Sequence, residues 1–291
     1  MEIAVFSDIH GNYVAFEQCL NIALARGIDT MIFLGDYLGE FPYPQKTLER
    51  LYALQKEKTC FFLKGNKEDY WLDRKYNENC AWKDAGASVG AMHYCYEHLT
   101  GRDIDFFQSL PIAREIQFVG AAPIMACHGS PVRNREKLFP ESNRTREILA
   151  ECPCRYILCG HTHYQGEICH GGKTAWNAGA VGVPLHSGGR AQFLILRQSG
   201  QEWEHEFVAV DYDRERVIRE LRESGLEERA PYWTRVTKHL IRTGEDSHVS
   251  VLSRAMRLCE EDGVEAVWYS IPERYWERAV SELVESKSAQ L

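Results

Sequence analysis

Short apolar runs that stop at polar residues dominate the start of the chain. Runs over residues 3–6, 30–34 and 60–63 each end in polar groups. Between them, residues 13–26 and 48–54 place apolar side chains at helical spacing. Alternating strands and helices favour a parallel sheet, and continuously apolar strands indicate that both faces of that sheet are covered. The carboxyl ends of such strands share one edge of the sheet, which is where ligands bind in these folds.

The pattern then changes twice along the chain. Residues 70–115 predict helices, after which short strands, including 191–197 and 204–210, predict a second, largely antiparallel sheet. Helical spacing returns after residue 210. We therefore expect one domain over residues 1–210 and a helical C-terminal extension over residues 211–291 that packs on it.

The composition of the chain argues against two classes of protein, those that bind nucleic acid non-specifically and those that associate with membranes. The 291 residues are 44% hydrophobic and 26% charged, and the net charge is −8. An acidic surface argues against non-specific binding to nucleic acid. We also expect no membrane association, because no apolar run is long enough to cross a bilayer. Without an export signal at its start, the chain is expected to be cytoplasmic, with its ten cysteines reduced and mostly structural.

Side chains of metal-ligating types follow the predicted strands. Asp8 and His10 come directly after the first strand, two positions apart, so both can point to the same side of an extended chain. A carboxylate and an imidazole together suit a borderline divalent metal. Alone, Asp8 could equally be a helix cap. Seven such residues at matching positions favour a metal site: Asp8, His10, Asp36, Asn66, His128, His161 and His163.

The segments that hold these residues resemble those of a known superfamily. They are Ser-Asp-Ile-His-Gly-Asn, Gly-Asp-Tyr-Leu-Gly, Lys-Gly-Asn, Cys-His-Gly-Ser and Gly-His-Thr-His, in this order. The series resembles the calcineurin-like metallophosphoesterases, most closely the small bacterial phosphodiesterases and the asymmetrical diadenosine tetraphosphate hydrolases. The resemblance covers roughly residues 1–210. It implies an α/β fold, a four-layer α/β/β/α sandwich of two mixed β-sheets flanked by helices.

The resemblance also implies a site for two metal ions. Its first ion would be held by Asp8, His10 and His163. Its second would be held by Asn66, His128 and His161, with Asp36 bridging the two. A hydroxide held between two such cations is a nucleophile at neutral pH. The ligand types suit manganese, iron, zinc or nickel better than magnesium or calcium. Asp36, Asn66 and His128 are the expected catalytic residues.

Lys67 is a departure from the pattern of the superfamily, because a histidine commonly follows the asparagine of the third segment. Two interpretations are open: Lys67 directs a fixed charge at phosphate, or it faces solvent, which we favour. In either case a general acid with a pKa near neutrality is missing there. We therefore expect substrates whose leaving group departs without a proton, such as a nucleotide released from a phosphoanhydride.

Two further sets of residues are candidates for substrate binding. Arg133 and Arg135 lie in a basic segment and could hold distal phosphates, although we favour a solvated basic face or ion pairs with neighbouring glutamates. Aromatic residues near the metal loops, Tyr70 among them, either stack on a base or pack beneath a loop. Asn177 follows the last segment and is a candidate hydrogen-bond partner of the site.

The predicted function is a dinuclear-metal phosphohydrolase that acts on a small phosphorylated substrate. Phosphodiester or phosphoanhydride bonds are the expected targets, dinucleoside polyphosphates included. The alternatives are a protein serine/threonine phosphatase and a non-catalytic scaffold. The first is disfavoured because those phosphatases carry Asp-Arg-Gly after this aspartate and a histidine after the asparagine, whereas here Tyr37-Leu38-Gly39 follows Asp36 and Lys67 follows Asn66. The C-terminal helices could cover the sandwich, narrow the access of substrate or form a homo-oligomer contact.

Overall fold

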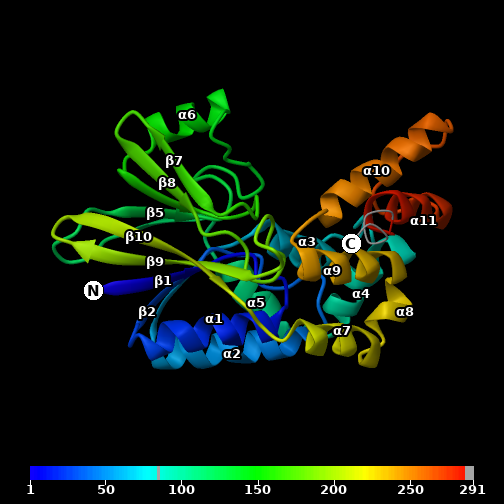
Figure 1. Ribbon diagram of the computed structural model, residues 1–291, viewed down its shortest axis with the longest axis horizontal. Coiled ribbons are helices and arrows are strands. Elements are labelled where there is room, and N and C mark those ends of the chain that lie inside the picture. Colours follow the sequence, from blue (N-terminus) through cyan, green and yellow to red (C-terminus); the bar gives the residue numbers. More distant parts are fainter. Residues whose placement is uncertain (84–85, 286–291) are drawn as a thin grey trace.

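Two stacked β-sheets with helices on their outer faces form the core of the computed structural model, which describes residues 1–83 and 86–285 (Figure 1). The first sheet has the strand order β10-β9-β1-β2-β3. Its strands are β1 (Glu2–Phe6), β2 (Thr30–Phe33), β3 (Thr59–Phe62), β9 (Ala191–Ser199) and β10 (Glu202–Val210). The second has the order β4-β5-β6-β8-β7. Its strands are β4 (Ala113–Ile116), β5 (Ile124–Cys127), β6 (Tyr156–Cys159), β7 (Gly166–His170) and β8 (Lys173–Asn177).

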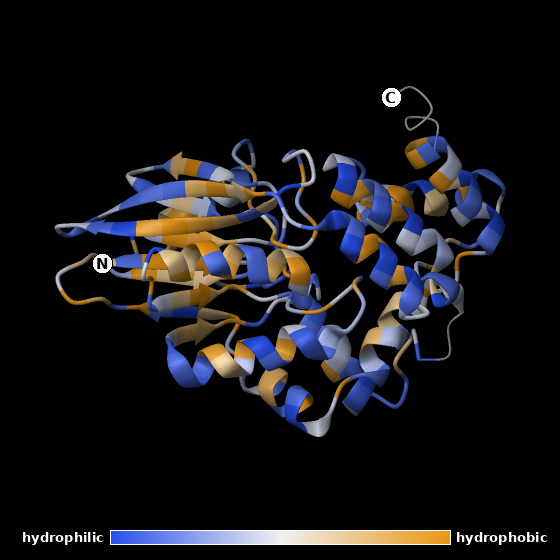
Figure 2. Ribbon diagram, turned by 60° about the horizontal axis from the view of Figure 1, so that its bottom comes forward, coloured by the Kyte–Doolittle hydropathy of each residue, from blue (hydrophilic) through white to orange (hydrophobic). Residues whose placement is uncertain are grey.

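Alternation along β1 explains the layers. Ala4 and Phe6 face the cluster that contains Phe16 of α1 (Tyr13–Ala25), whereas Ile3 and Val5 face the cluster shared with the second sheet. Helix α2 (Pro44–Glu57) covers the same outer face as α1, and α6 (Asn143–Glu151) packs on the outer face of the second sheet. Apolar stretches run through the strands of the sandwich, whereas the helices mix apolar and hydrophilic residues along their length (Figure 2). The predicted α/β/β/α sandwich is confirmed.

The prediction for the second sheet was wrong in two respects. That sheet is mixed, because β5, β6 and β8 run parallel and only the edge strands β4 and β7 are antiparallel. The segments 191–197 and 204–210 belong instead to the first sheet, where β9 pairs antiparallel with β1. Residues Ala191–Leu196 are buried without interruption, so β9 needs cover on both faces and a neighbour on each side. An apolar run in the sequence indicates that a strand is buried, but it does not indicate which strand it pairs with.

The remaining helices gather at the end of the sheets where β1 and β2 terminate (Figure 1). Between β3 and β4 these are α3 (Asn66–Tyr76), the 3₁₀ turn Ala87–Val89, α4 (Gly90–Glu97) and α5 (Gly101–Ser109). After β10 they are α7 (Arg214–Glu223), α8 (Leu226–Arg229), α9 (Pro231–Thr243), α10 (His248–Glu261), α11 (Glu273–Val280) and a short π-helical turn, Ser281–Glu285. Helices α7 and α9 contact the sandwich, since Val217 and Leu240 share a cluster with Val14 and Val183.

Two other predictions can be compared with this fold. All ten cysteines are free thiols, and eight of them are buried. In the part of the chain that the structure describes, no helix combines the length and the apolarity that a bilayer crossing needs.

Candidate active site

The backbone at the candidate ligands adopts an unusual conformation. Among the described residues, only eight non-glycine residues have a positive φ, and five of them are candidate ligands. These five are Asp8 (54°), His10 (53°), Asp36 (54°), His161 (63°) and His163 (62°). Such left-handed conformations are disfavoured for residues with a Cβ atom and concentrate at functional sites. The turns that follow β1, β2 and β6 are thus built to direct these side chains toward one place.

Close packing between the loops fixes these turns. The Asp8 amide donates to the Gly35 carbonyl at 3.1 Å. A Cβ atom on Gly160 would lie 1.9 Å from Ser7 Oγ and 2.6 Å from Asp8 Oδ2, so only glycine fits there. As predicted, Asn177 supports the site: its side-chain amide donates to the Gly160 carbonyl at 2.7 Å. The loop after β6 is therefore held directly against the loop after β1.

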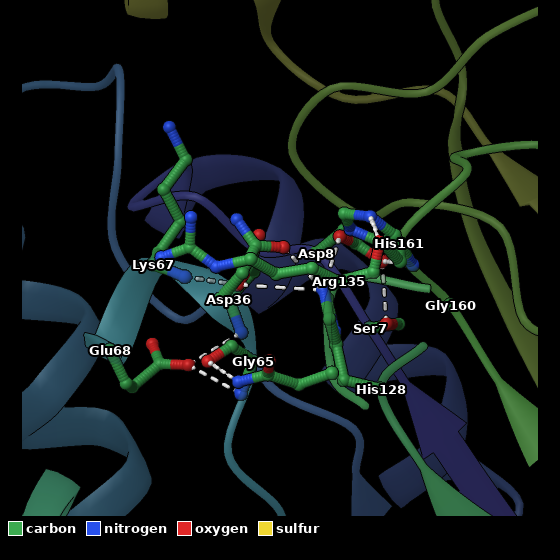
Figure 3. Close-up of polar contacts among 12 residues, drawn as sticks. Ser7, Asp8, Asp36, Gly65, Lys67, Glu68, His128, Arg135, Gly160 and His161 are labelled. Atoms are coloured by element: carbon green, nitrogen blue, oxygen red, sulfur yellow. Dashed lines mark hydrogen bonds and ion pairs between the residues drawn. The ribbon is translucent and has the colours of Figure 1, made fainter. Parts of the chain in front are cut away.

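One carboxylate oxygen of Asp8 accepts hydrogen bonds from the protein, and the other has no hydrogen-bond partner among the described residues. Oδ2 accepts from Ser7 Oγ at 2.6 Å and from the His161 amide at 3.0 Å (Figure 3). Oδ1 is buried and lacks a hydrogen-bond partner among the described residues. It lies 3.2 Å from His163 Nε2 and 3.7 Å from His10 Nε2. A buried, unpartnered oxygen that faces two imidazole nitrogens is a suitable ligand for a cation.

The pKa values agree with a charged Asp8. Burial by itself would raise the pKa of this carboxyl group. The neighbouring imidazoles of His128, His163 and His10 nevertheless hold that pKa well below its usual range. The group is therefore an ionised ligand at neutral pH.

His10 is oriented by a residue that the sequence did not reveal. Glu40, 3% exposed, accepts a 2.5 Å hydrogen bond from His10 Nδ1, which turns Nε2 toward Asp8 and Asp36. Nε2 itself is buried and has no partner among the residues described. Burial lowers the pKa of His10, but the Glu40 carboxylate overrides this and raises it to about 10. Carboxylates that hold the second nitrogen of a ligand histidine are typical of metal sites.

The expectation that Lys67 faces solvent was wrong. Its Nζ lies 2.5 Å from Glu40 Oε1, and its side chain is only 15% exposed. The ion pair satisfies the second oxygen of Glu40, which would otherwise be a buried charge. Burial lowers the pKa of Lys67, but Glu40 raises it above its ordinary value. Lys67 is consequently a fixed cation that belongs to the support of His10.

The remaining candidate ligands surround Asp36. Asp36 Oδ2 lies 3.6 Å from His10 Nε2, and Oδ1 lies 3.5 Å from His128 Nε2, so this carboxylate stands between the two histidines. Asn66 Oδ1 is 3.2 Å from His128 Nε2. Buried Glu68 accepts hydrogen bonds from the amides of Asp36 and Gly65 and thereby holds the turn in place. Burial and the nearby Asp36 raise the pKa of Glu68 to about 7.

Two groups of these side chains are compact enough to hold a metal ion, with ligand atoms within 4.8 Å of one another. One group is Asp8, His10 and His163, and the other is Asp8, Asp36 and His128. His161 is in neither group: its Nε2 lies 3.1 Å from the Arg135 carbonyl, which leaves its other nitrogen as the candidate ligand atom. The buried oxygens and imidazole nitrogens fit divalent transition metals.

The sequence of the first part of the chain decides the family. The model of the calcineurin-like phosphoesterases matches residues 1–165. The chain belongs to the calcineurin-like phosphoesterase family. It is accordingly a metal-dependent phosphoesterase, and the two ligand groups described above are where this phosphoesterase can hold divalent ions.

Other proteins resemble this phosphoesterase over most of its length. An uncharacterized protein, MJ0912 of Methanocaldococcus jannaschii, is 27% identical over 248 residues, which cover 79% of this chain and 94% of that protein. A hypothetical protein, PH1004 of Pyrococcus horikoshii, has the same fold, with a TM-score of 0.71, 19% identity and coverage of 84% and 99% of the two chains. A metallophosphoesterase from Sphaerobacter thermophilus has a TM-score of 0.65, 22% identity and coverage of 84% and 100%.

The phosphoesterase site opens into a pocket of about 390 Å³, within the range of small-molecule sites. His10, Asp36, Asn66, His161 and His163 line its floor. Much of the remaining lining is apolar and comes from α4, α9, α10 and the loop before α11.

The two arginines predicted to bind substrate are not part of the pocket lining, whereas Lys137 is. Arg135 places its guanidinium 4.7 Å from the ring centre of Tyr70, and its side chain is exposed. Arg133 is exposed beside the site. Their contribution to substrate binding stays a prediction. Lys137 belongs to the same basic segment of the sequence as these two arginines. The sequence offered no spacing rule for Glu40 and Glu68, which are recognisable only once the loops are seen to converge.

Proposed function

We propose that this phosphoesterase hydrolyses phosphodiester or phosphoanhydride bonds of a small phosphorylated substrate at a dinuclear metal centre. The observation that carries the proposal is the position of Asp36, whose two carboxylate oxygens face His10 on one side and His128 on the other. A carboxylate in this position suits a bridge between two ions.

The ligands divide into two sets in this proposal. Asp8, His10 and His163 would hold one ion, and Asn66, His128 and His161 the other, with Asp36 shared. When bound, the ions lower the pKa of water and neutralise charge on the phosphoryl oxygens. The protein contributes a fixed geometry: Glu40 orients His10, Glu68 holds the Asp36 turn, and Ser7 fixes one oxygen of Asp8. Pre-oriented ligands need no reorganisation during the reaction.

Lys67 supports a preference for good leaving groups. Its ammonium group is paired with Glu40 and its pKa is raised, so it cannot release a proton readily at neutral pH. No acid with a pKa near neutrality therefore occupies the position that follows Asn66. A nucleotide released from a phosphoanhydride departs without needing a proton. Dinucleoside polyphosphates meet this requirement, and simple alkyl monophosphates do not.

The test is hydrolysis by the manganese-loaded protein of bis(p-nitrophenyl) phosphate and, in parallel, of diadenosine tetraphosphate, with the products separated by chromatography. We expect turnover of the diester and equal amounts of ATP and AMP. Asp36→Asn should lower the rate roughly a hundredfold or more, because even partners of metal ligands contribute 10–100-fold. The exposed Asp105→Asn is the matched control. Full activity after chelation, or faster turnover of an alkyl monophosphate, would contradict the proposal.

A further inference from the structure

Aromatic and apolar side chains line the part of the pocket above the ligands. Helices α9 and α10 and the loop before α11 contribute Trp233, Leu240, Leu252 and Trp268 to this wall, although they lie far from the ligand segments in the sequence. Tyr70 of α3 completes it, with its ring centre 5.9 Å from that of Trp268. An apolar pocket beside a few convergent polar groups is the usual form of a small-molecule site.

The mouth of the pocket is apolar as well. Phe139, Tyr164 and Val249 line it, and they are 37%, 42% and 57% exposed. They are three of the eight large hydrophobic side chains that are exposed among the described residues. Phosphate chemistry does not need apolar side chains, and their exposure to water is unfavourable. Their concentration at one opening therefore points to a ligand that covers them.

His248 adds one directional polar contact to this apolar wall. The Thr237 hydroxyl donates to the Trp233 carbonyl at 3.0 Å, and its oxygen lies 2.8 Å from His248 Nε2, which favours the tautomer with the proton on Nε2. This leaves Nδ1 of His248 as a hydrogen-bond acceptor, in a side chain that lines the pocket. Burial lowers the pKa of His248 to about 4, so the ring is neutral at pH 7.

We propose that the C-terminal helices form a subsite for a planar aromatic group of nucleobase size, attached to the phosphate that is cleaved. The pocket lining provides the aromatic side chains of Trp268 and Tyr70 and apolar cover from Val249 and Leu252. His248 provides a ring nitrogen, Nδ1, that is available for a hydrogen bond to a polar group of the base. The substrate class is then nucleotide-like rather than an alkyl phosphate. This inference rests on the proposed function, because the substrate's phosphate is placed at the ligand groups.

The size of the effect follows from stacking. Contact between a base and an aromatic side chain strengthens binding by roughly 5- to 150-fold. Adenosine 5′-monophosphate and ribose 5-phosphate carry the same phosphate and differ by the base. We therefore expect the metal-loaded protein to bind the nucleotide at least tenfold more tightly than the sugar phosphate, as measured by titration calorimetry.

Two variants locate the effect. Trp268→Ala should reduce the ratio of the two dissociation constants to below about threefold. Val249→Asp should reduce it too, because it places a carboxylate at the mouth; this side chain is exposed, at the first turn of α10, where an acidic residue is tolerated. Tyr76→Ala removes an exposed aromatic residue outside the pocket and should leave the ratio unchanged. Metal content and far-ultraviolet circular dichroism verify that each variant is folded and loaded.

The outcomes separate this inference from the proposed function. Equal binding of the two phosphates by the wild-type protein, or a ratio that both variants leave intact, would overturn the aromatic subsite even if bis(p-nitrophenyl) phosphate is hydrolysed. A ratio that collapses in both variants would establish the subsite even if no diester is cleaved.

Discussion

At the scale of single residues, the site depends on side chains that complete one another's bonding. Asp8 accepts hydrogen bonds from Ser7 and His161 with one carboxylate oxygen. Its other oxygen faces His10 and His163. His10 is fixed in the same way, because Glu40 occupies one of its two ring nitrogens. Within the described part of the chain, Asp8 Oδ1 and His10 Nε2 therefore lack a hydrogen-bond partner because the other polar atom of each side chain is already held by a neighbouring residue.

Glu40→Gln tests the support of His10. We expect the affinity for manganese to fall roughly 10–100-fold, the usual cost of losing a partner of a ligand histidine. The change also leaves Lys67 without its carboxylate partner. Titration calorimetry at constant pH measures the affinity, and exposed Glu49→Gln is the control. An unchanged affinity would show that Glu40 is not needed to orient His10.

Gly160→Ala tests the contact between the two ligand loops. The added methyl group would clash with Ser7 Oγ and Asp8 Oδ2, so the loop must shift, at a cost of about 1–3 kcal/mol of stability. Metal content should fall with it, because Asp8 loses its position. Gly166→Ala is a matched control, since nothing lies within 4 Å of its new Cβ atom. If both variants bind metal and melt alike, the close packing described here is not required.

Much of this residue-scale detail could be read from the sequence, and some could not. The seven candidate ligands stand next to apolar strands in recognisable segments. In the structure five of them line the pocket, and Asp8 and His128 each lie within 4 Å of at least one of those five. Glu40 and Lys67 were missed as a pair, because 27 positions separate them and their contact exists only after the loops after β2 and β3 come together. Positive φ angles at Asp8 and His161 left no compositional signal either.

At the scale of elements, the carboxyl ends of parallel strands create the site and the C-terminal helices enclose it. Strands β1, β2 and β3 run parallel, so their following turns meet at one edge. The order of elements predicted this edge correctly. The same pattern assigned β9 and β10 to the wrong sheet. Local pattern indicates that a strand is buried, but its neighbours depend on pairing with segments far away in the sequence.

Leu240→Ala tests how α9 joins the sandwich. Leu240 is fully buried in a cluster with Val183 and Val14, so truncation should cost about 2–5 kcal/mol in the free energy of unfolding. Urea unfolding should remain a single transition, since the helices and the sandwich share this cluster. Val132→Ala, at a 58% exposed position, should change stability by less than about 0.5 kcal/mol. Two separate transitions would instead indicate that residues 211–291 fold as an independent unit.

Considered as a whole, the molecule brings side chains from two parts of the fold into one pocket. The sandwich contributes the polar candidate ligands from its strand ends, and the helices of the last third contribute most of the aromatic wall. The acidic balance of the chain, −8 overall, is compatible with this arrangement, because the groups that face phosphate are local. The sequence pointed to the candidate ligands at the strand ends but not to Glu40, which orients one of them. The sequence did not predict the aromatic wall. The periodicity of a helix indicates that one of its faces is buried, but it does not indicate which part of the protein that face contacts.

The proposed mechanism needs two metal ions per chain, and a metal titration can count them against activity. Protein freed of metal by chelation is titrated with manganese while bound metal and the hydrolysis of bis(p-nitrophenyl) phosphate are followed together. We predict no turnover without metal, and activity that rises to a plateau at two equivalents per chain. Full activity in the chelated protein, or a plateau at one equivalent, would contradict the dinuclear centre.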